Sequence, residues 1–184
     1  MRRILAGFGF LALLLACHGA PVSAHGAAAA PLPRLAGRVI LAGCRQGECG
    51  WLRIVAAESV ARVAEGELRR MVARRGSSVH DGRLPERERE ARIAWEANDS
   101  VGYAFCSARR PAYAFEREGE GLIVHFLDLY DLAGYQFVSA GLYMRLCHGR
   151  ERLPRAAVLR RLGYRPGTRS EQVEGATPET MTRF

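Results

Sequence analysis

Four cysteines behind an N-terminal apolar segment place the strongest constraint on how this chain can fold. Cys44, Cys49, Cys106 and Cys147 all lie well beyond that segment. An even number of cysteines in an exported chain is typical of a disulfide framework, because thiols oxidise in pairs in an oxidising compartment. The fold is therefore expected to bring these four residues together two by two.

The first 16 residues have the composition of an export signal, a positively charged start followed by an apolar run. Arg2 and Arg3 supply positive charge, and Ile4 to Ala16 is an apolar run of thirteen residues. A run of this length is too short to cross a bilayer as a helix, but it fits the apolar region of a secretory signal. We therefore predict a signal peptide over residues 1–24, followed by a spacer over residues 25–34.

Two cleavage sites compete behind the apolar run. Small residues in Val22-Ser23-Ala24 predict cleavage before His25, which would release a periplasmic or secreted protein. Leu14-Leu15-Ala16-Cys17 resembles a bacterial lipobox, and cleavage there would leave Cys17 lipidated. We favour the first site. The alternative is a protein anchored in the envelope by a lipid on Cys17, and only in that case do we expect membrane attachment.

Four cysteines allow three pairings, and their spacing favours one of them. Cys44 and Cys49 flank a tight loop between two predicted strands. Cys106 and Cys147 would close a loop of about forty residues, worth about 4 kcal/mol in the chain-entropy model. The other two pairings stay open. The cysteine spacing fits neither a zinc site nor a covalently attached haem, so we expect no metal and no cofactor.

The charge of the chain is positive but modest. The formal net charge is +8, and every basic residue is an arginine. Removal of Arg2 and Arg3 leaves 25 arginines against 19 acidic residues, a net charge of +6. Such a charge permits attraction to anionic envelope polymers. It does not indicate nucleic-acid binding, because no basic run is interleaved with stacking aromatic residues.

Short apolar runs separated by turn residues predict a disulfide-stabilised β-rich domain over residues 35–163. Strands are expected at Leu35–Gly43, Gly50–Ala57, Ala91–Ala97, Val101–Cys106, Ala112–Phe115 and Gly121–Leu129. Residues 58–75 fit either a helix or a hairpin that turns at Gly66, and we favour the hairpin because glycine inside a helix costs about 1 kcal/mol. The pattern lacks strand–helix alternation. The fold class is therefore mainly β (α+β), an antiparallel barrel or sandwich of about six to eight strands with a C-terminal helix.

Helices are expected only toward the end of the chain. Pro154 and Gly163 frame a predicted C-terminal helix over Leu153–Leu162. Ser139 is placed to cap a shorter helix that ends near His148. Residues 164–184 are polar and rich in Pro, Gly, Thr and Glu, which predicts a disordered tail.

The sequence contains no convincing catalytic constellation, and we name no catalytic residue. Ser77, Ser78, His80 and Asp81 cluster in a stretch typical of a hydrated turn. Catalytic triads are recognised by their geometry in space, so this adjacency carries little weight. We keep His80 and Asp81 as candidate ligand-binding residues.

An arginine pair and one histidine are the other polar side chains considered as ligand-binding residues. Arg109 and Arg110 precede Pro111 in a predicted loop, where they could hold a phosphate or carboxylate. His125 lies in the most apolar run of the chain, where we expect a hydrogen-bonded core residue. We therefore add only the two arginines to the candidate ligand-binding residues.

Two stretches resemble uncharacterised exported proteins of GC-rich proteobacteria. They are Phe105-Cys106-Ser107 with Arg110-Pro111, and Ser139-Ala140-Gly141-Leu142-Tyr143 leading to Cys147-His148-Gly149. The resemblance covers about residues 37 to 150 and implies the same envelope address, with no known activity attached. Small exported inhibitors of lysozyme are also disulfide-bearing β-barrels, but that likeness rests on Ser139 to Tyr143 and is an analogy only.

The sequence thus predicts an exported envelope protein that acts as a non-enzymatic binding module for an envelope protein or an anionic polymer. Two alternatives remain. One is a small envelope hydrolase that uses His80, and the other is a structural lipoprotein anchored at Cys17.

Overall fold

The computed structural model describes residues 30–31, 34–117 and 119–183. The predicted signal peptide, Cys17 and residues 25–29 of the predicted spacer lie outside the described residues.

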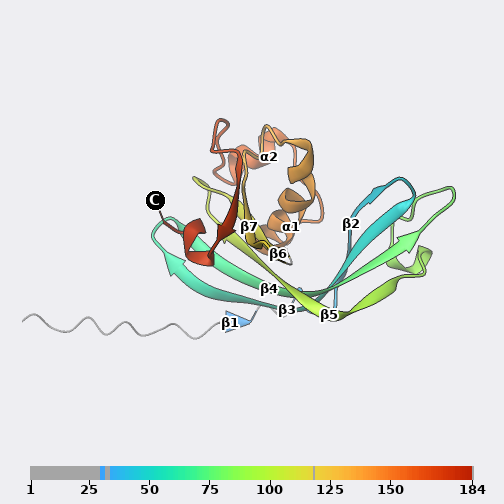
Figure 1. Ribbon diagram of the computed structural model, residues 1–184. Helices are drawn as coiled ribbons and strands as arrows, with labels where there is room; N and C mark the ends of the chain where they lie inside the picture. The colour runs from blue at the N-terminus through green and yellow to red at the C-terminus, as the bar shows by residue number, and fades with distance from the viewer. Residues whose placement is uncertain (1–29, 32–33, 118, 184) are drawn as a thin grey trace, which may run out of the picture.

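One antiparallel sheet and two helices make up the described fold (Figure 1). The strands are β1 (Ala30–Pro31), β2 (Val39–Arg45), β3 (Glu48–Val63), β4 (Gly66–Val79), β5 (Ala94–Cys106), β6 (Ala112–Arg117), β7 (Gly121–Phe126) and β8 (Glu171–Ala176). The helices are α1 (Phe137–His148) and α2 (Ala156–Arg161), and short 3-10 turns occupy Glu88–Glu90, Gly134–Gln136 and Pro178–Met181.

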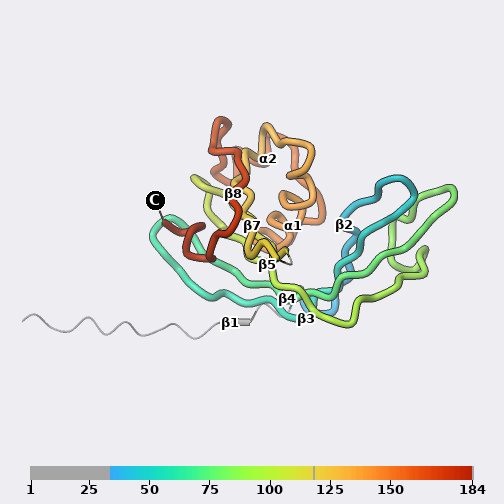
Figure 2. Tube along the Cα trace, in the orientation of Figure 1, coloured from blue at the N-terminus to red at the C-terminus, as the bar shows by residue number. Residues whose placement is uncertain are grey.

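The strands from β2 to β8 pair in chain order, each antiparallel to the next. The sheet curls into a half-barrel with α1 on its concave side, as the ribbon and the tube both show (Figures 1 and 2). The mainly β, antiparallel fold class with a C-terminal helical part is confirmed. One correction concerns the spacer, because Ala30 and Pro31 pair with Ser59 and Glu58 of β3 as the short strand β1.

Residues 58–75 form a hairpin, which confirms the favoured prediction. Strands β3 and β4 pair along their whole length, and Val63 faces Gly66 where the chain turns. The helical alternative is wrong, because Glu58–Val63 and Gly66–Arg75 lie in paired antiparallel strands. The glycine marks the turn, as expected from its conformational freedom.

Bulges and one continuous long strand give the sheet its curl. β3 shifts register twice against β4, between Ile54 and Ala56 and again between Ser59 and Ala61. An extra residue in one strand bends it and increases its twist. The two strands predicted at 91–97 and 101–106 are instead one strand, β5, which follows the same curve.

The sheet is buried on both faces where β5, β6 and β7 meet. Alternate residues of a strand point to opposite faces. Tyr113 packs into the cluster that contains α1, whereas its neighbours Ala112 and Ala114 pack into a second cluster with Met181. The second cluster is completed by the C-terminal segment, which runs beside β7 as β8 (Figure 2). The apolar run in β7 is therefore buried on both sides.

The predicted tail over residues 164–184 is wrong for the described part. Tyr164 is buried, Met181 is fully buried, and β8 pairs with β7. Tyr164 packs in the cluster that contains α1, whereas Val173, Ala176 and Met181 meet the face of the sheet that α1 does not cover. Composition cannot reveal such a contact, because only the fold brings the two surfaces together.

The helix predictions also need correction. The long helix is α1, and the helix predicted at 153–162 shrinks to α2 because the backbone stays extended at Arg155. Ser139 does not cap α1, whose N-cap is Gln136. The Ser139 hydroxyl bonds to His125 on β7 instead of to the backbone of its own helix.

Candidate functional site

A cavity of about 430 Å³ opens between the concave face of the sheet and the first turn of α1. Its floor is apolar and aromatic, with lining residues from the strands β2 to β6. The apolar residues that line it are Ala42, Trp51, Leu52, Met71, Val101, Tyr113, Phe115, Tyr135, Val138 and Leu142. A concave apolar surface with a few polar groups is the usual form of a ligand site in proteins.

A hydrogen-bonded chain fixes the aromatic floor of this cavity. The Trp51 indole Nε1–H donates to Ser78 Oγ at 2.8 Å. Ser78 Oγ lies 2.8 Å from His80 Nε2. Trp51 and Ser78 are buried, so these bonds satisfy polar atoms that would otherwise be costly to bury.

The rim of the cavity is acidic. Glu48, Glu96 and Glu116 line it together with one arginine, Arg75. Arg75 Nε bonds to a Glu96 carboxylate oxygen at 3.0 Å. Among the described residues, neither Glu48 nor Glu116 forms an ion pair. The cavity therefore carries negative charge in a chain whose formal net charge is +8.

Three exposed apolar side chains at the start of α1 lie at or beside the mouth of this cavity. We call Tyr135, Phe137 and Val138 the apolar strip. Their exposed fractions are 55%, 59% and 43%, large values for residues of this kind. Contiguous exposed apolar side chains beside a hollow mark a surface suited to binding another molecule.

His125 and Ser139 form the one serine–histidine pair that lines the cavity in the part of the chain described. His125 Nδ1 lies 2.8 Å from Ser139 Oγ, and His125 Nε2 lies 3.0 Å from Gln172 Oε1. The Gln172 amide nitrogen donates to Glu174, so its oxygen faces the imidazole. His125 Nε2 therefore carries the proton, and Nδ1 accepts from the serine hydroxyl.

The electrostatics of this pair suit a structural role better than nucleophilic catalysis. Burial lowers the pKa of His125, the hydrogen bond to Gln172 opposes this, and the nearby Arg117 lowers the pKa further. In a catalytic triad a carboxylate stabilises the imidazolium that forms when the serine loses its proton. Here a neutral amide stands in that position and a cation lies nearby.

His80 and Asp81, the candidates from the sequence, do not line the cavity. His80 is half-buried, and its backbone N–H donates to Gly47 O at 2.8 Å. Through Ser78 it supports the indole of Trp51, which does line the cavity. Asp81 is exposed in the loop that follows β4. The hydrolase that would use His80 stays a prediction.

Arg109 and Arg110 also lie away from the cavity. The guanidinium of Arg110 lies 4.6 Å from the Phe126 ring centroid, and that of Arg169 lies 4.7 Å from the same ring. Arg110 also donates to the backbone carbonyl of Arg183. Arg109 is exposed. Arg110 thus helps to hold the C-terminal segment against the sheet.

The structure joins the cysteines in the pairing that their spacing favours. Cys44 and Cys49 face each other across β2 and β3, with Cα atoms 4.0 Å apart. Gln46 and Gly47, both with positive φ, form the two-residue turn between them, the geometry that matches the strand twist. The second disulfide joins Cys106 at the end of β5 to Cys147 in the last turn of α1. Two disulfides are compatible with a protein that folds outside the cytoplasm.

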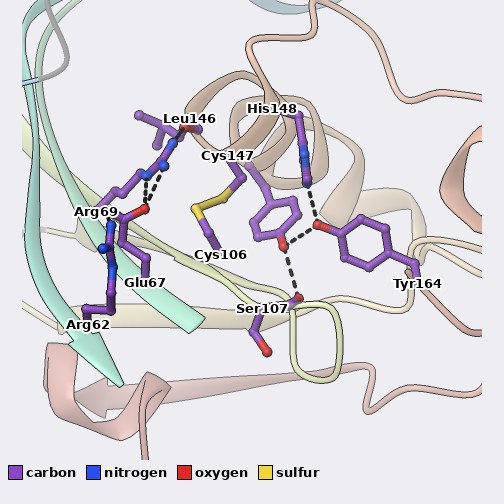
Figure 3. The surroundings of a disulfide bond; sticks show 10 residues. Arg62, Glu67, Arg69, Cys106, Ser107, Leu146, Cys147, His148 and Tyr164 are labelled. Carbon is purple, nitrogen blue, oxygen red and sulfur yellow. Dashed lines mark hydrogen bonds and ion pairs between the residues drawn. A yellow bond between two sulfur atoms is a disulfide. The ribbon is translucent and has the colours of Figure 1, made fainter. Parts of the chain in front are cut away.

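A buried polar chain lies beside the second disulfide (Figure 3). The Tyr143 hydroxyl donates to Ser107 O at 3.1 Å, and its oxygen lies 2.7 Å from the Tyr164 hydroxyl. Tyr164 therefore donates to Tyr143 and accepts from His148 Nε2, 2.5 Å away. Burial raises the pKa of Tyr164 to about 12 and lowers that of His148.

Comparison of the chain with protein-family models, with curated proteins and with solved structures found no match. The resemblance to exported proteobacterial proteins therefore stays a prediction. Separately, no helix among the described residues has both the length and the apolar character needed to cross a membrane.

Sequence reasoning missed the cavity because its lining comes from strands that are distant in the chain. Glu48 and Glu116 have a sequence separation of 68 and carry no local motif. One signal was available at α1, whose sequence is apolar on nearly all sides. Such a helix must either be buried all round or present apolar side chains to a partner.

Proposed function

We propose that this protein is an exported binding module, periplasmic or secreted, that holds a segment of a partner protein in the acidic cavity beside α1. The observation that carries the proposal is the cavity itself, with an apolar floor, an acidic rim and the apolar strip at or beside its mouth. The occupant we propose is a segment in which apolar side chains alternate with lysine or arginine.

Charge complementarity favours a protein segment over an anionic polymer, the two classes of partner expected from the sequence. An anionic polymer entering this cavity would meet the unpaired carboxylates of Glu48 and Glu116, and like charges in a partly desolvated site repel. A basic segment would gain two ion pairs there. The apolar strip would then cover apolar side chains of the partner, and this burial supplies most of the affinity in protein interfaces.

The proposed location, periplasmic or secreted, rests on the predicted signal peptide and on the two disulfides. Mass spectrometry of the N-terminus of the protein purified from its native host tests this part. A free His25 supports release, and a diacylglyceryl Cys17 supports the lipoprotein alternative. A retained Met1 with free thiols would contradict export altogether.

Selection from random dodecapeptides displayed on phage tests the binding function, with the disulfide-bonded protein as bait. Val138→Asp is the counter-selection bait, because it puts a charge in the apolar strip at a side chain that is 43% exposed. Val63→Asp is the matched control, since Val63 is 38% exposed, lies at the opposite end of β3 from Glu48 and does not line the cavity.

We expect the enriched peptides to pair apolar residues with Lys or Arg. Their affinity should fall about tenfold or more in Val138→Asp, the range for a residue central to an interface, and change little in Val63→Asp. Glu116→Lys should favour acidic peptides instead. Enrichment of acidic peptides by the unmodified protein, or equal binding to Val138→Asp, would contradict the proposal.

A further inference from the structure

A second hollow lies at the other end of α1, and its chemistry is opposite to that of the acidic cavity. Two adjoining cavities of about 460 Å³ and 310 Å³ share Arg34, Leu35, Arg145, His148 and Gly149 in their linings. We call this region the arginine pocket. It is independent of the acidic cavity, with which it shares no lining residue.

The arginine pocket carries positive charge that the protein itself does not neutralise. Arg38 is balanced by Glu151, with Nη2 and Oε1 2.8 Å apart, and Arg69 is balanced by Glu67 at 2.6 Å. Among the described residues, no carboxylate forms an ion pair with Arg34 or Arg145. Glu151 also lines this hollow but is paired with Arg38, so two guanidinium groups face the hollow with no ion pair of their own among the described residues.

Arg145 is the better placed of these two cations. It is half-buried in the last turns of α1, and its Nη2 donates only a long bond, 3.4 Å, to the backbone oxygen of Glu151. Burial and the neighbouring Arg38 both lower the pKa of Arg145, while Glu151 raises it. A bound anion would relieve the cost of burying this cation.

The negative end of the α1 dipole does not cancel this positive charge. Helix carbonyls that lack partners attract cations and repel anions. Here Gly149 N–H donates to Arg145 O at 2.9 Å, Arg150 N–H donates to Met144 O at 3.2 Å, and Arg69 Nη1 donates to Leu146 O at 2.5 Å. Three carbonyls near the end of α1, those of Met144, Arg145 and Leu146, are therefore already hydrogen-bonded.

We infer that the arginine pocket binds a phosphate group, with Arg145 and Arg34 as its two charged donors and His148 beside them. A guanidinium offers two parallel N–H donors, which match two oxygens of a phosphate. Two unbalanced cations match the charge of a phosphate better than that of a single carboxylate. The group can belong to a soluble phosphate compound or to the headgroup of an anionic lipid.

Two probes separate these sources when both are applied to the disulfide-bonded protein at low salt. Inorganic pyrophosphate, followed by isothermal titration calorimetry, reports binding of a soluble phosphate. Cosedimentation with phosphatidylcholine vesicles, with and without phosphatidylglycerol, reports binding of a headgroup. Low salt matters because exposed charges are screened over about 10 Å at 0.1 M salt.

The variants are Arg145→Gln and Arg34→Gln, with Arg89→Gln as the matched control. Arg34 is exposed, so its replacement tests the pocket even if Arg145→Gln fails to fold. Arg89 is an exposed arginine in the loop between β4 and β5, and it lines neither of the two cavities that form the arginine pocket. All three variants remove the same charge.

We expect binding to weaken about tenfold in Arg145→Gln, the loss typical of one charged hydrogen-bonding partner, and less than about twofold in Arg89→Gln. Binding of pyrophosphate with this pattern assigns a soluble phosphate. Binding restricted to phosphatidylglycerol vesicles, with the same pattern, assigns a headgroup. Equal loss in all three variants would mean attraction to net charge alone and would overturn the inference, as would no binding of either probe.

Discussion

The two buried or half-buried histidines of α1 and β7 sit where a positive charge is unfavourable. Burial lowers the pKa of His125, and Arg117 lowers it further against the Gln172 hydrogen bond. Burial, Arg150 and Arg69 lower the pKa of His148. Both rings are therefore neutral hydrogen-bonding groups near neutral pH, which agrees with the proton positions deduced for each chain of bonds.

These lowered pKa values predict acid sensitivity of the fold. The unfolded chain binds protons below about pH 6.5, the ordinary histidine value, before the folded protein does. The stability from these groups is thus complete above that pH and is lost as the pH falls. The urea concentration at the unfolding midpoint should fall as the pH is lowered from about 7.5 to about 5. This fall should be smaller in the double variant that carries both His125→Gln and His148→Gln. An unchanged slope in the double variant would contradict this assignment.

A glycine beneath the acidic cavity is predicted to resist substitution. A Cβ at Gly102 would lie 2.7 Å from the Tyr113 hydroxyl oxygen and 3.2 Å from Ala114 O. Because Tyr113 is buried, Gly102→Ala should cost about 1–3 kcal/mol of unfolding free energy through overpacking. Gly141→Ala in α1 is the control, since its Cβ meets nothing within 4 Å and alanine favours a helix by up to about 1 kcal/mol. Urea denaturation of both variants is the measurement, and equal effects would refute the close approach.

At the scale of elements, the C-terminal segment packs against the sheet although its polar composition predicted disorder. It adds β8 to the sheet and inserts Met181, which is 0% exposed, between side chains of the second core cluster. Arg110 and Arg169 lie against Phe126 beside it. The segment closes a face of β5–β7 that would otherwise expose apolar residues to water.

Truncation of one side chain tests this role. Met181→Ala should lower the unfolding free energy by about 2–5 kcal/mol, the range for removing a large buried side chain. Val79→Ala, at an exposed position, should change it by no more than about 0.5 kcal/mol. Thermal or urea unfolding distinguishes the two. A Met181→Ala protein as stable as Val79→Ala would show that the segment does not hold the sheet in solution.

Prediction of elements succeeded where local pattern and final environment agree. The β3–β4 hairpin followed from a glycine at a turn, and β7 followed from an apolar run that is buried on both faces. Prediction failed for residues 164–184, whose order depends on contacts with distant strands. It also placed Ser139 as a cap, because the sequence does not show that β7 carries His125 to within hydrogen-bonding distance of that hydroxyl.

At the scale of the whole molecule, α1 separates two regions of opposite charge. The acidic cavity lies at its first turn and the arginine pocket at its last. This arrangement matches the helix dipole, which is positive at the N-terminus and negative at the C-terminus. The dipole therefore stabilises the protein's own charges at both ends of α1, and in our two proposals these charges, not the dipole, attract the basic segment and the phosphate group.

The two disulfides are expected to contribute unequally to the free energy of unfolding. The Cys106–Cys147 bond spans a sequence separation of 41 and ties α1 to β5, whereas Cys44–Cys49 spans 5 within one hairpin. In the chain-entropy model, removing the first with paired alanines should cost about 4 kcal/mol, and removing the second about 2 kcal/mol. Urea unfolding of the two double variants measures this difference. A larger loss from the hairpin bond would contradict the assignment of α1 as the tethered element.

The sequence alone determined what depends on local chemistry: the cysteine framework with its favoured pairing, the antiparallel β character, and the turn at Gly66. These follow from oxidation in pairs, from alternation along strands and from the freedom of one backbone position. Only the tertiary structure decided where the sites lie. Glu48 and Glu116 line one cavity, and Arg34 and Arg145 line another, because the curled sheet and α1 bring distant segments together. No local sequence pattern encodes that curvature.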